Sequence, residues 1–165
     1  DADLTEIGSA QPLFTFGWNN TVTYKNWDFT AFFRGVYGND VLNVTRWAYA
    51  PQKGDNGLNV YIEQAEAIAN GEGTYRQERF SDYYLEDGSY IKLDNITIGY
   101  TVPITNKKYV QSLRLYVTGQ NIFTLTNYSG IDPEVNTSSV WDPGIDFVSF
   151  YPSVRNFMLG LSVTL

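Results

Sequence analysis

The stretch that decides the fold is RNFMLGLSVTL, residues 155–165. Every second side chain in it is apolar, and those between are mostly small or polar. Because side chains alternate across a β-strand, one face of this strand is apolar and the other can meet water. The apolar face runs for about ten residues, the length that a tilted strand needs to cross a bilayer. Its members are Phe157, Leu159, Leu161, Val163 and Leu165.

Four further segments carry strand-like patterns, and together they predict an all-β, antiparallel fold. The strands are expected at about residues 13–24, 27–37, 90–102, 113–124 and 154–165. Lys25 and Asn26 form a tight turn signal between the first two strands. In the third strand the apolar positions change parity, and a β-bulge near Asp94 and Asn95 would realign its two faces.

The connections between these strands are alternately short and long. The long ones cover about residues 38–88 and 125–152, and residues 60–70 of the first are expected to form a short helix closed by Gly71. Outer-membrane barrels have this asymmetry, with short periplasmic turns and long extracellular loops. On that pattern both long connections are extracellular, and the terminal strand descends to a periplasmic Leu165.

The composition excludes several classes of function. The chain of 165 residues has no cysteine and no histidine, which rules out thiolate chemistry, serine–histidine–aspartate triads and histidine metal sites. Its net charge of −7 and lack of a basic patch argue against nucleic-acid binding. It contains no apolar run long enough for a transmembrane helix, so a membrane role would have to use strands. We expect no enzymatic activity.

An antiparallel sandwich in water would also give alternating strands. Two features favour the membrane alternative. The polar faces carry Thr, Asn, Gly and Ser with few Lys or Glu, whereas a solvated sandwich face normally carries interspersed charge. Tyr24, Trp27 and Tyr100 lie at strand ends, where aromatic girdles sit in membrane barrels. A soluble carbohydrate-binding β-sandwich is the alternative interpretation.

Several longer motifs resemble one family. Residues 90–103, YIKLDNITIGYTVP, and residues 113–136, LRLYVTGQNIFTLTNYSGIDPEVN, are similar to the C-terminal end of SusC/RagA-like TonB-dependent outer-membrane transporters. Residues 5–43 resemble the hairpin that precedes it, and the ending YPSVRNFMLGLSVTL resembles its last strand. The resemblance implies a 22-stranded transmembrane barrel, of which residues 1–165 would supply the last five strands and two extracellular loops.

The same resemblance implies a function and partners. The family imports oligosaccharides (glycans) or peptides across the outer membrane, energised by the TonB complex and lidded by a SusD-like surface lipoprotein. The barrel wall would contact outer-membrane lipid, and we expect the plug domain and the TonB-contacting segment to lie elsewhere in the polypeptide. A homologue that mainly senses a ligand is a second alternative.

Candidate residues follow from the polar strand faces and the loops. Tyr128, Asp132 and Glu134 belong to the family-like motif YSGIDPE, which either faces a ligand or the lid, or is a turn fixed by its Gly and Pro. Loop aromatics such as Trp47 and Trp141 either stack on sugar rings or pack the loops. The residues expected to line the barrel lumen are Asn19, Thr21, Thr30, Arg34, Tyr116 and Gln120.

Asp1, Asp3 and Glu6 resemble the tail of an acidic, calcium-type loop. Calcium requires 6–8 oxygen ligands, and this segment offers only three acidic residues. The favoured interpretation is therefore a solvated acidic loop, with Ca²⁺ as a weak alternative. We expect no other cofactor.

Overall fold

The structure is a computed structural model that describes residues 5–53, 59–73, 75–76, 80–105, 109–135, 141–148 and 151–165. The described residues form two compact units. The sheet unit comprises Phe14–Val36, Tyr90–Thr126 and Ser153–Leu165. The loop unit comprises the residues up to Leu13, Tyr37–Ser89 and Asn127–Pro152. No described helix is both long enough and apolar enough to cross a membrane.

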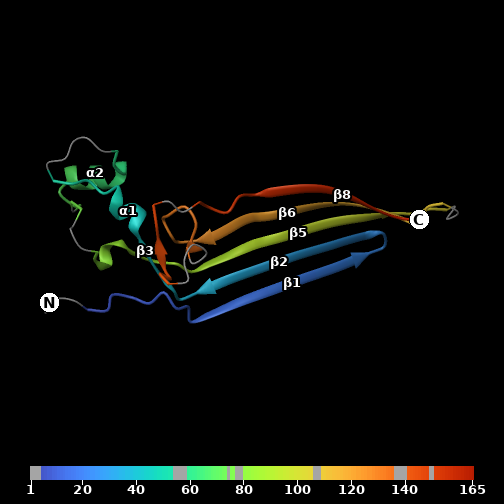
Figure 1. The fold of residues 1–165 in the computed structure, drawn as a ribbon, viewed down its shortest axis with the longest axis horizontal. Helices are drawn as coiled ribbons and strands as arrows, with labels where there is room; N and C mark the ends of the chain where they lie inside the picture. Colours follow the sequence, from blue (N-terminus) through green and yellow to red (C-terminus); the bar gives the residue numbers. More distant parts are fainter. Residues whose placement is uncertain are drawn as a thin grey trace. The chain divides into compact units, whose positions relative to one another are not determined.

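The sheet unit is one five-stranded antiparallel sheet in the order β1-β2-β5-β6-β8. Its long strands run side by side in Figure 1. The expected strands and the Lys25–Asn26 turn are confirmed. The strand bounds are β1, Phe14–Tyr24; β2, Trp27–Tyr37; β5, Tyr90–Val102; β6, Ser112–Thr126; and β8, Asn156–Thr164.

The predicted β-bulge is present in β5. Against β2, the pairing passes from Phe32↔Asn95 to Phe33↔Leu93, which leaves Asp94 without a rung of its own. The Arg34 Nε lies 3.2 Å from the Asp94 Oδ1, so an ion pair holds the extra residue. Because a bulge adds one residue to one strand, it restores the alternation of the two faces beyond it.

One face of the sheet is apolar, and no described residue covers it. Leu159 is 83% exposed, Phe157 72% and Leu161 66%. The ladder places Val117 beside Leu159 and Ile98 beside Val117, so the apolar stripe continues across neighbouring strands. We call this surface the apolar face and the opposite one the polar face. A protein core would have buried these side chains, and here they are open.

The polar face carries paired side chains instead. Arg114 donates from its Nε to the Asp28 Oδ1 at 2.8 Å and from its Nη2 to the other carboxylate oxygen. The two residues come from β6 and β2, and Gly99 of β5 lies between those strands. A Cβ at Gly99 would come within 2.5 Å of the Asp28 carboxylate and 2.6 Å of the Arg114 Nε. The absent side chain therefore lets the ion pair span the strand.

The loop unit is built from short elements around a small sheet of order β4-β3-β7. Strand β3 is antiparallel to β4 and parallel to β7. The predicted helix is confirmed as α2, and Gly71 follows it with φ of 77°. The small sheet was not predicted. The elements are β3, Asp40–Asn43; α1, Val44–Ala48; α2, Ile62–Ala69; η1, Asp82–Tyr84; β4, Leu85–Asp87; and β7, Ile145–Asp146.

Deleting Asp94 tests the role of the bulge. Without it the residues on one side must swap faces, which would move the buried Lys92 to the apolar face and Leu93 to the polar one. We expect the free energy of unfolding of the full-length protein to fall by at least about 2 kcal/mol. Deletion of Thr105, in the connection after β5, is the control. Equal losses in chemical denaturation of the two variants would contradict this role.

Candidate functional site

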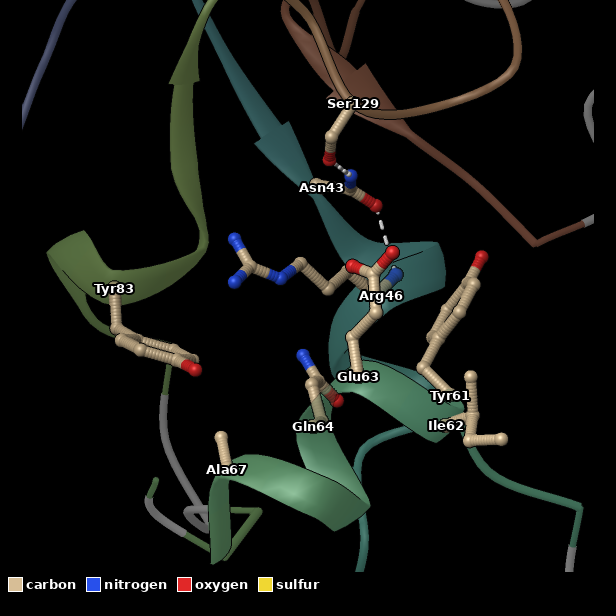
Figure 2. Close-up of a pocket in the computed structure, with 9 residues that line it drawn as sticks. All are labelled: Asn43, Arg46, Tyr61, Ile62, Glu63, Gln64, Ala67, Tyr83 and Ser129. Atoms are coloured by element: carbon tan, nitrogen blue, oxygen red, sulfur yellow. Dashed lines mark hydrogen bonds between the residues drawn. The ribbon is translucent and has the colours of Figure 1, made fainter. Parts of the chain in front are cut away.

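The loop unit contains a pocket of about 350 Å³, drawn in Figure 2. Its walls come from the end of β3, from α1, from α2 with the residue before it, and from η1, with one residue from the segment after β6. Segments that are far apart in the sequence therefore meet around one space. The described residues that line it are Asn43, Arg46, Tyr61, Ile62, Glu63, Gln64, Ala67, Tyr83 and Ser129.

Glu86 of β4 fixes three of these segments to one another. Its Oε1 accepts hydrogen bonds from the Asn43 Nδ2 at 3.1 Å and the Ser129 Oγ at 2.8 Å, and its Oε2 accepts one from the Ser129 backbone N–H at 2.8 Å. The Arg46 Nη1 lies 3.3 Å from the same carboxylate. Hydrogen bonds to an ionised group are stronger than neutral ones, so Glu86 stabilises the frame of the pocket.

Asn43 and Arg46 are positioned by the start of α1. The Asn43 Oδ1 accepts a hydrogen bond from the Arg46 backbone N–H at 2.7 Å, which makes Asn43 the N-cap of the helix. The Arg46 guanidinium lies 5.0 Å from the centre of the Tyr83 ring. A cation over an aromatic face is attracted by it, so Arg46 is held by Glu86 and by Tyr83.

Gln64 is the buried residue of α2, with 6% of its surface exposed. Neither its Oε1 nor its Nε2 has a hydrogen-bond partner among the described residues. Figure 2 shows its carboxamide directed toward the space bounded by Arg46 and Tyr83. A buried polar group without a partner costs about 1–3 kcal/mol, so this orientation requires a reason.

Tyr128 and Asp146 form a second buried contact in the loop unit. The Tyr128 hydroxyl donates to the Asp146 Oδ2 at 2.5 Å, and the Thr45 hydroxyl also donates to Asp146. Burial raises the pKa of Asp146, and these two hydrogen bonds oppose the rise. Burial, the bond to Asp146 and its charge raise the pKa of Tyr128, so Tyr128 stays a donor. With Val41 and Val135, Tyr128 forms the core of this unit.

The structure places all six predicted lumen-lining residues on the polar face. Thr30, Tyr116 and Gln120 share that face through the ladder, and Arg34 follows by alternation along β2. In β1, the Trp18 ring packs on the Phe33 ring on the apolar face, with 5.7 Å between the ring centres. Because side chains alternate along the strand, Asn19 and Thr21 lie on the polar face. Their role in a lumen stays a prediction.

The predicted loop residues lie in different surroundings. Tyr128 and Asp132 are buried, and the Asp132 Oδ1 accepts from the Glu134 backbone N–H at 3.1 Å, a geometry that favours a locally fixed turn. Trp47 packs on Phe80 at 4.9 Å, whereas Trp141 is 91% exposed. A ligand- or lid-facing role for these residues stays a prediction.

Of the calcium candidates, Asp1 and Asp3 lie outside the described residues, and Glu6 is exposed. Within the described ranges no three acidic, histidine or cysteine residues are grouped closely enough to hold a metal ion.

Gln64, Glu86 and Arg46 were missed as site residues from the sequence. Asn43 three residues before Arg46 is a helix-start signal that could have located α1. The sequence holds no local signal for Glu86, because its partners lie 40–43 residues away.

Comparison with known proteins agrees with this architecture. The chain is 35% identical to TonB-dependent receptor P3 of Formosa agariphila over 98% of its own length and 17% of that protein's. It is 34% identical to TonB-dependent receptor SusC of Bacteroides thetaiotaomicron over 89% of its own length and 14% of SusC. The chain therefore spans about a sixth of the length of these relatives. No family model matches it.

Solved structures show the same fold. The RagAB peptide transporter superposes with a TM-score of 0.76 at 21% identity, over 94% of this chain and 18% of that one. RagAB in its open-open state superposes with a TM-score of 0.74 at 20% identity, over 94% and 17%. The fold is thus that of part of a transmembrane β-barrel wall with its loops. With the sequence relatives, it identifies the chain as a segment of the SusC/RagA-like TonB-dependent receptors.

Tyr128→Phe tests the buried pair. Because the pKa of folded Asp146 is raised, its contribution to stability is fully present below its unfolded pKa and is lost as the pH rises through the folded value. Removing the Tyr128 hydroxyl raises that pKa further. We expect a loss of about 1–3 kcal/mol in unfolding free energy at neutral pH, shrinking toward acid pH.

Tyr49→Phe, at an exposed tyrosine of the same unit, is the control for this substitution. Denaturation of both full-length variants at several pH values measures the effect. A loss for Tyr128→Phe that does not change with pH would contradict the coupling to Asp146.

Proposed function

We propose that this chain forms part of the wall and two extracellular loops of an outer-membrane transporter that imports nutrients by a TonB-dependent mechanism. The observation that carries the proposal is the uncovered apolar face of the sheet opposite a polar face of paired side chains. A soluble sandwich would bury such a face against a second sheet. In the hydrocarbon core of a membrane, exposure of this apolar face is favourable.

The ends of the strands support an orientation. The Lys25–Asn26 turn, the connection after Val102 and the C-terminus of β8 belong to one end of the sheet, because Trp27 pairs with Tyr100 and Ser112 with Thr164. This end is periplasmic in our proposal, since barrels keep their short turns there. The Trp27 and Tyr100 rings pack at the same end, with 4.7 Å between their centres, as expected of an interfacial aromatic girdle.

The polar face lines the lumen in this proposal. On this face Asp28 pairs with Arg114 and Arg34 with Asp94. The Lys92 Nζ donates to the Ser153 Oγ at 3.2 Å, and the Thr97 and Thr118 hydroxyls are 2.9 Å apart. Paired polar groups cost little next to water and leave donors and acceptors for a passing solute. Import then consists of capture outside, movement of a plug driven by TonB, and passage along this wall.

The partners follow from the relatives. We propose a SusD-like surface lipoprotein as the lid, the TonB complex as the energy source, and an oligosaccharide or a peptide as the substrate. The relatives are named as receptors and as a peptide transporter, which supports transport over catalysis.

Two neighbouring residues of β8 test which face meets lipid. Leu159→Arg puts a charge on the apolar face, and we expect it to lower the unfolding free energy of the full-length receptor in bilayers by about 2–4 kcal/mol. Met158→Arg puts the same charge on the polar face opposite Thr118, with an expected change within about 1 kcal/mol. Equal losses would show that hydrocarbon does not cover the Leu159 side.

Uptake by cells tests the function itself. Strains carrying or lacking the full-length receptor, each with and without TonB, are given labelled neutral oligosaccharides and labelled peptides. We expect uptake of one class only when receptor and TonB are both present. Uptake that continues without TonB, or that does not depend on the receptor, would refute the proposal.

A further inference from the structure

We infer that the pocket between α1, α2 and η1 binds one or two residues of a neutral saccharide, with Gln64 as the polar anchor. Its volume of about 350 Å³ is at the lower end of the range for small-molecule sites, so the ligand portion it holds is small. The inference deepens the proposed import function, on which its biological meaning rests, but binding can be measured without transport.

The strongest observation is the unpartnered carboxamide of Gln64. This side chain is buried on α2, yet both its polar atoms lack partners among the described residues. A carboxamide offers two N–H donors and one carbonyl acceptor. The matching ligand must therefore donate and accept at nearly the same place, and adjacent sugar hydroxyls do so because each is both donor and acceptor.

The charge of the pocket favours a neutral ligand. Among the lining residues that the structure describes, only Arg46 and Glu63 are charged, and their charges are opposite. Arg46 is already paired with Glu86 and lies over the Tyr83 ring. An ionised ligand would meet no uncommitted cation among the described lining residues and would lose its hydration on entry.

Two tyrosines supply the apolar part of the lining. Tyr61 is 43% exposed and Tyr83 39%, so each presents part of its ring to the pocket or to solvent. Figure 2 shows the two rings on opposite sides of the space that holds the Gln64 carboxamide. A tyrosine combines an apolar ring with a polar tip. This suits a sugar, whose C–H faces are apolar and whose rim carries hydroxyls.

The walls of the pocket are less suited to a peptide. Extended peptides are bound by pairing with a strand edge or by lying in an aromatic groove, and helical ones by lying in an apolar groove. The described lining comes mainly from helices, and its one strand residue, Asn43, ends β3. Strand β3 is the central strand of its sheet, paired with β4 on one side and with β7 on the other, so it offers no free edge to a peptide. A saccharide is therefore the favoured occupant.

Gln64→Leu in the full-length receptor tests the anchor without any ligand. Leucine is of similar size and has no polar group, so it removes an unpaired buried amide. We expect the midpoint of thermal unfolding to stay the same or rise. Gln11→Leu, at an exposed glutamine of the same unit, is the control. A clear fall for Gln64→Leu alone would mean that other parts of the receptor already bond to the amide, and would overturn the inference.

Binding is measured by titration calorimetry on the purified receptor in detergent. The probes are neutral di- and trisaccharides of glucose, galactose and N-acetylglucosamine, and peptides from a casein digest. We expect one saccharide series to bind the wild type and Gln11→Leu equally, and Gln64→Leu at least tenfold more weakly.

Three results would overturn the site: no saccharide binds, peptides alone bind, or Gln64→Leu binds as the wild type does. Saccharide binding that depends on Gln64 without TonB-dependent uptake would refute the proposed import and leave the site standing. TonB-dependent uptake without saccharide binding that depends on Gln64 would refute the site and leave the proposed import standing.

Discussion

The constraint on which the sheet depends is the pairing of its backbone. Among the described strands, β2, β5 and β6 each have a hydrogen-bonded neighbour on both sides, whereas β1 and β8 have one on a single side. In hydrocarbon each unpaired backbone group costs several kcal/mol. A five-stranded sheet with an apolar outer face is therefore stable in a membrane only when further strands pair with β1 and β8. The relatives, about six times longer than this chain, have ample length to supply them.

The same pairing determines where each side chain points. Because one-residue slips exchange the faces, the register must be fixed wherever one face is apolar. Leu93 and Ile96 are three positions apart and would face opposite sides of a regular strand. The bulge at Asp94 brings both of them to the apolar face. The ion pair of Arg34 with Asp94 ties the bulge to the polar face. Asp94, the extra residue of the bulge, therefore also contributes a carboxylate to the polar face.

Much of the sheet was predictable because period-two alternation is a local signal. Strand bounds, the Lys25–Asn26 turn, the bulge and α2 could all be inferred from neighbouring residues. The loop unit could not. Its strands have two to four residues, too few for a period, and β3 pairs with β7 about 100 residues later in the chain.

The candidate site was hidden for a related reason. Gln64 occupies the buried side of α2, where apolar residues are expected. From the sequence alone, a polar residue at this position only weakens the helix pattern and does not indicate a site. Glu86 acts through partners brought near by the small sheet. The predicted loop residues came from a motif, and the structure shows that Tyr128 and Asp132 of this motif stabilise the loop from inside.

The most direct test of the account is a nitroxide scan of β8 in the full-length receptor. Single cysteines are placed in turn from Asn156 to Thr164 for labelling, and these 165 residues hold no other cysteine that would take the label. With the receptor in bilayers, we predict high collision with oxygen dissolved in lipid at positions 157, 159, 161 and 163, and low collision at the positions between them. A profile without alternation, or one with the opposite phase, would contradict the claim that hydrocarbon covers the apolar face.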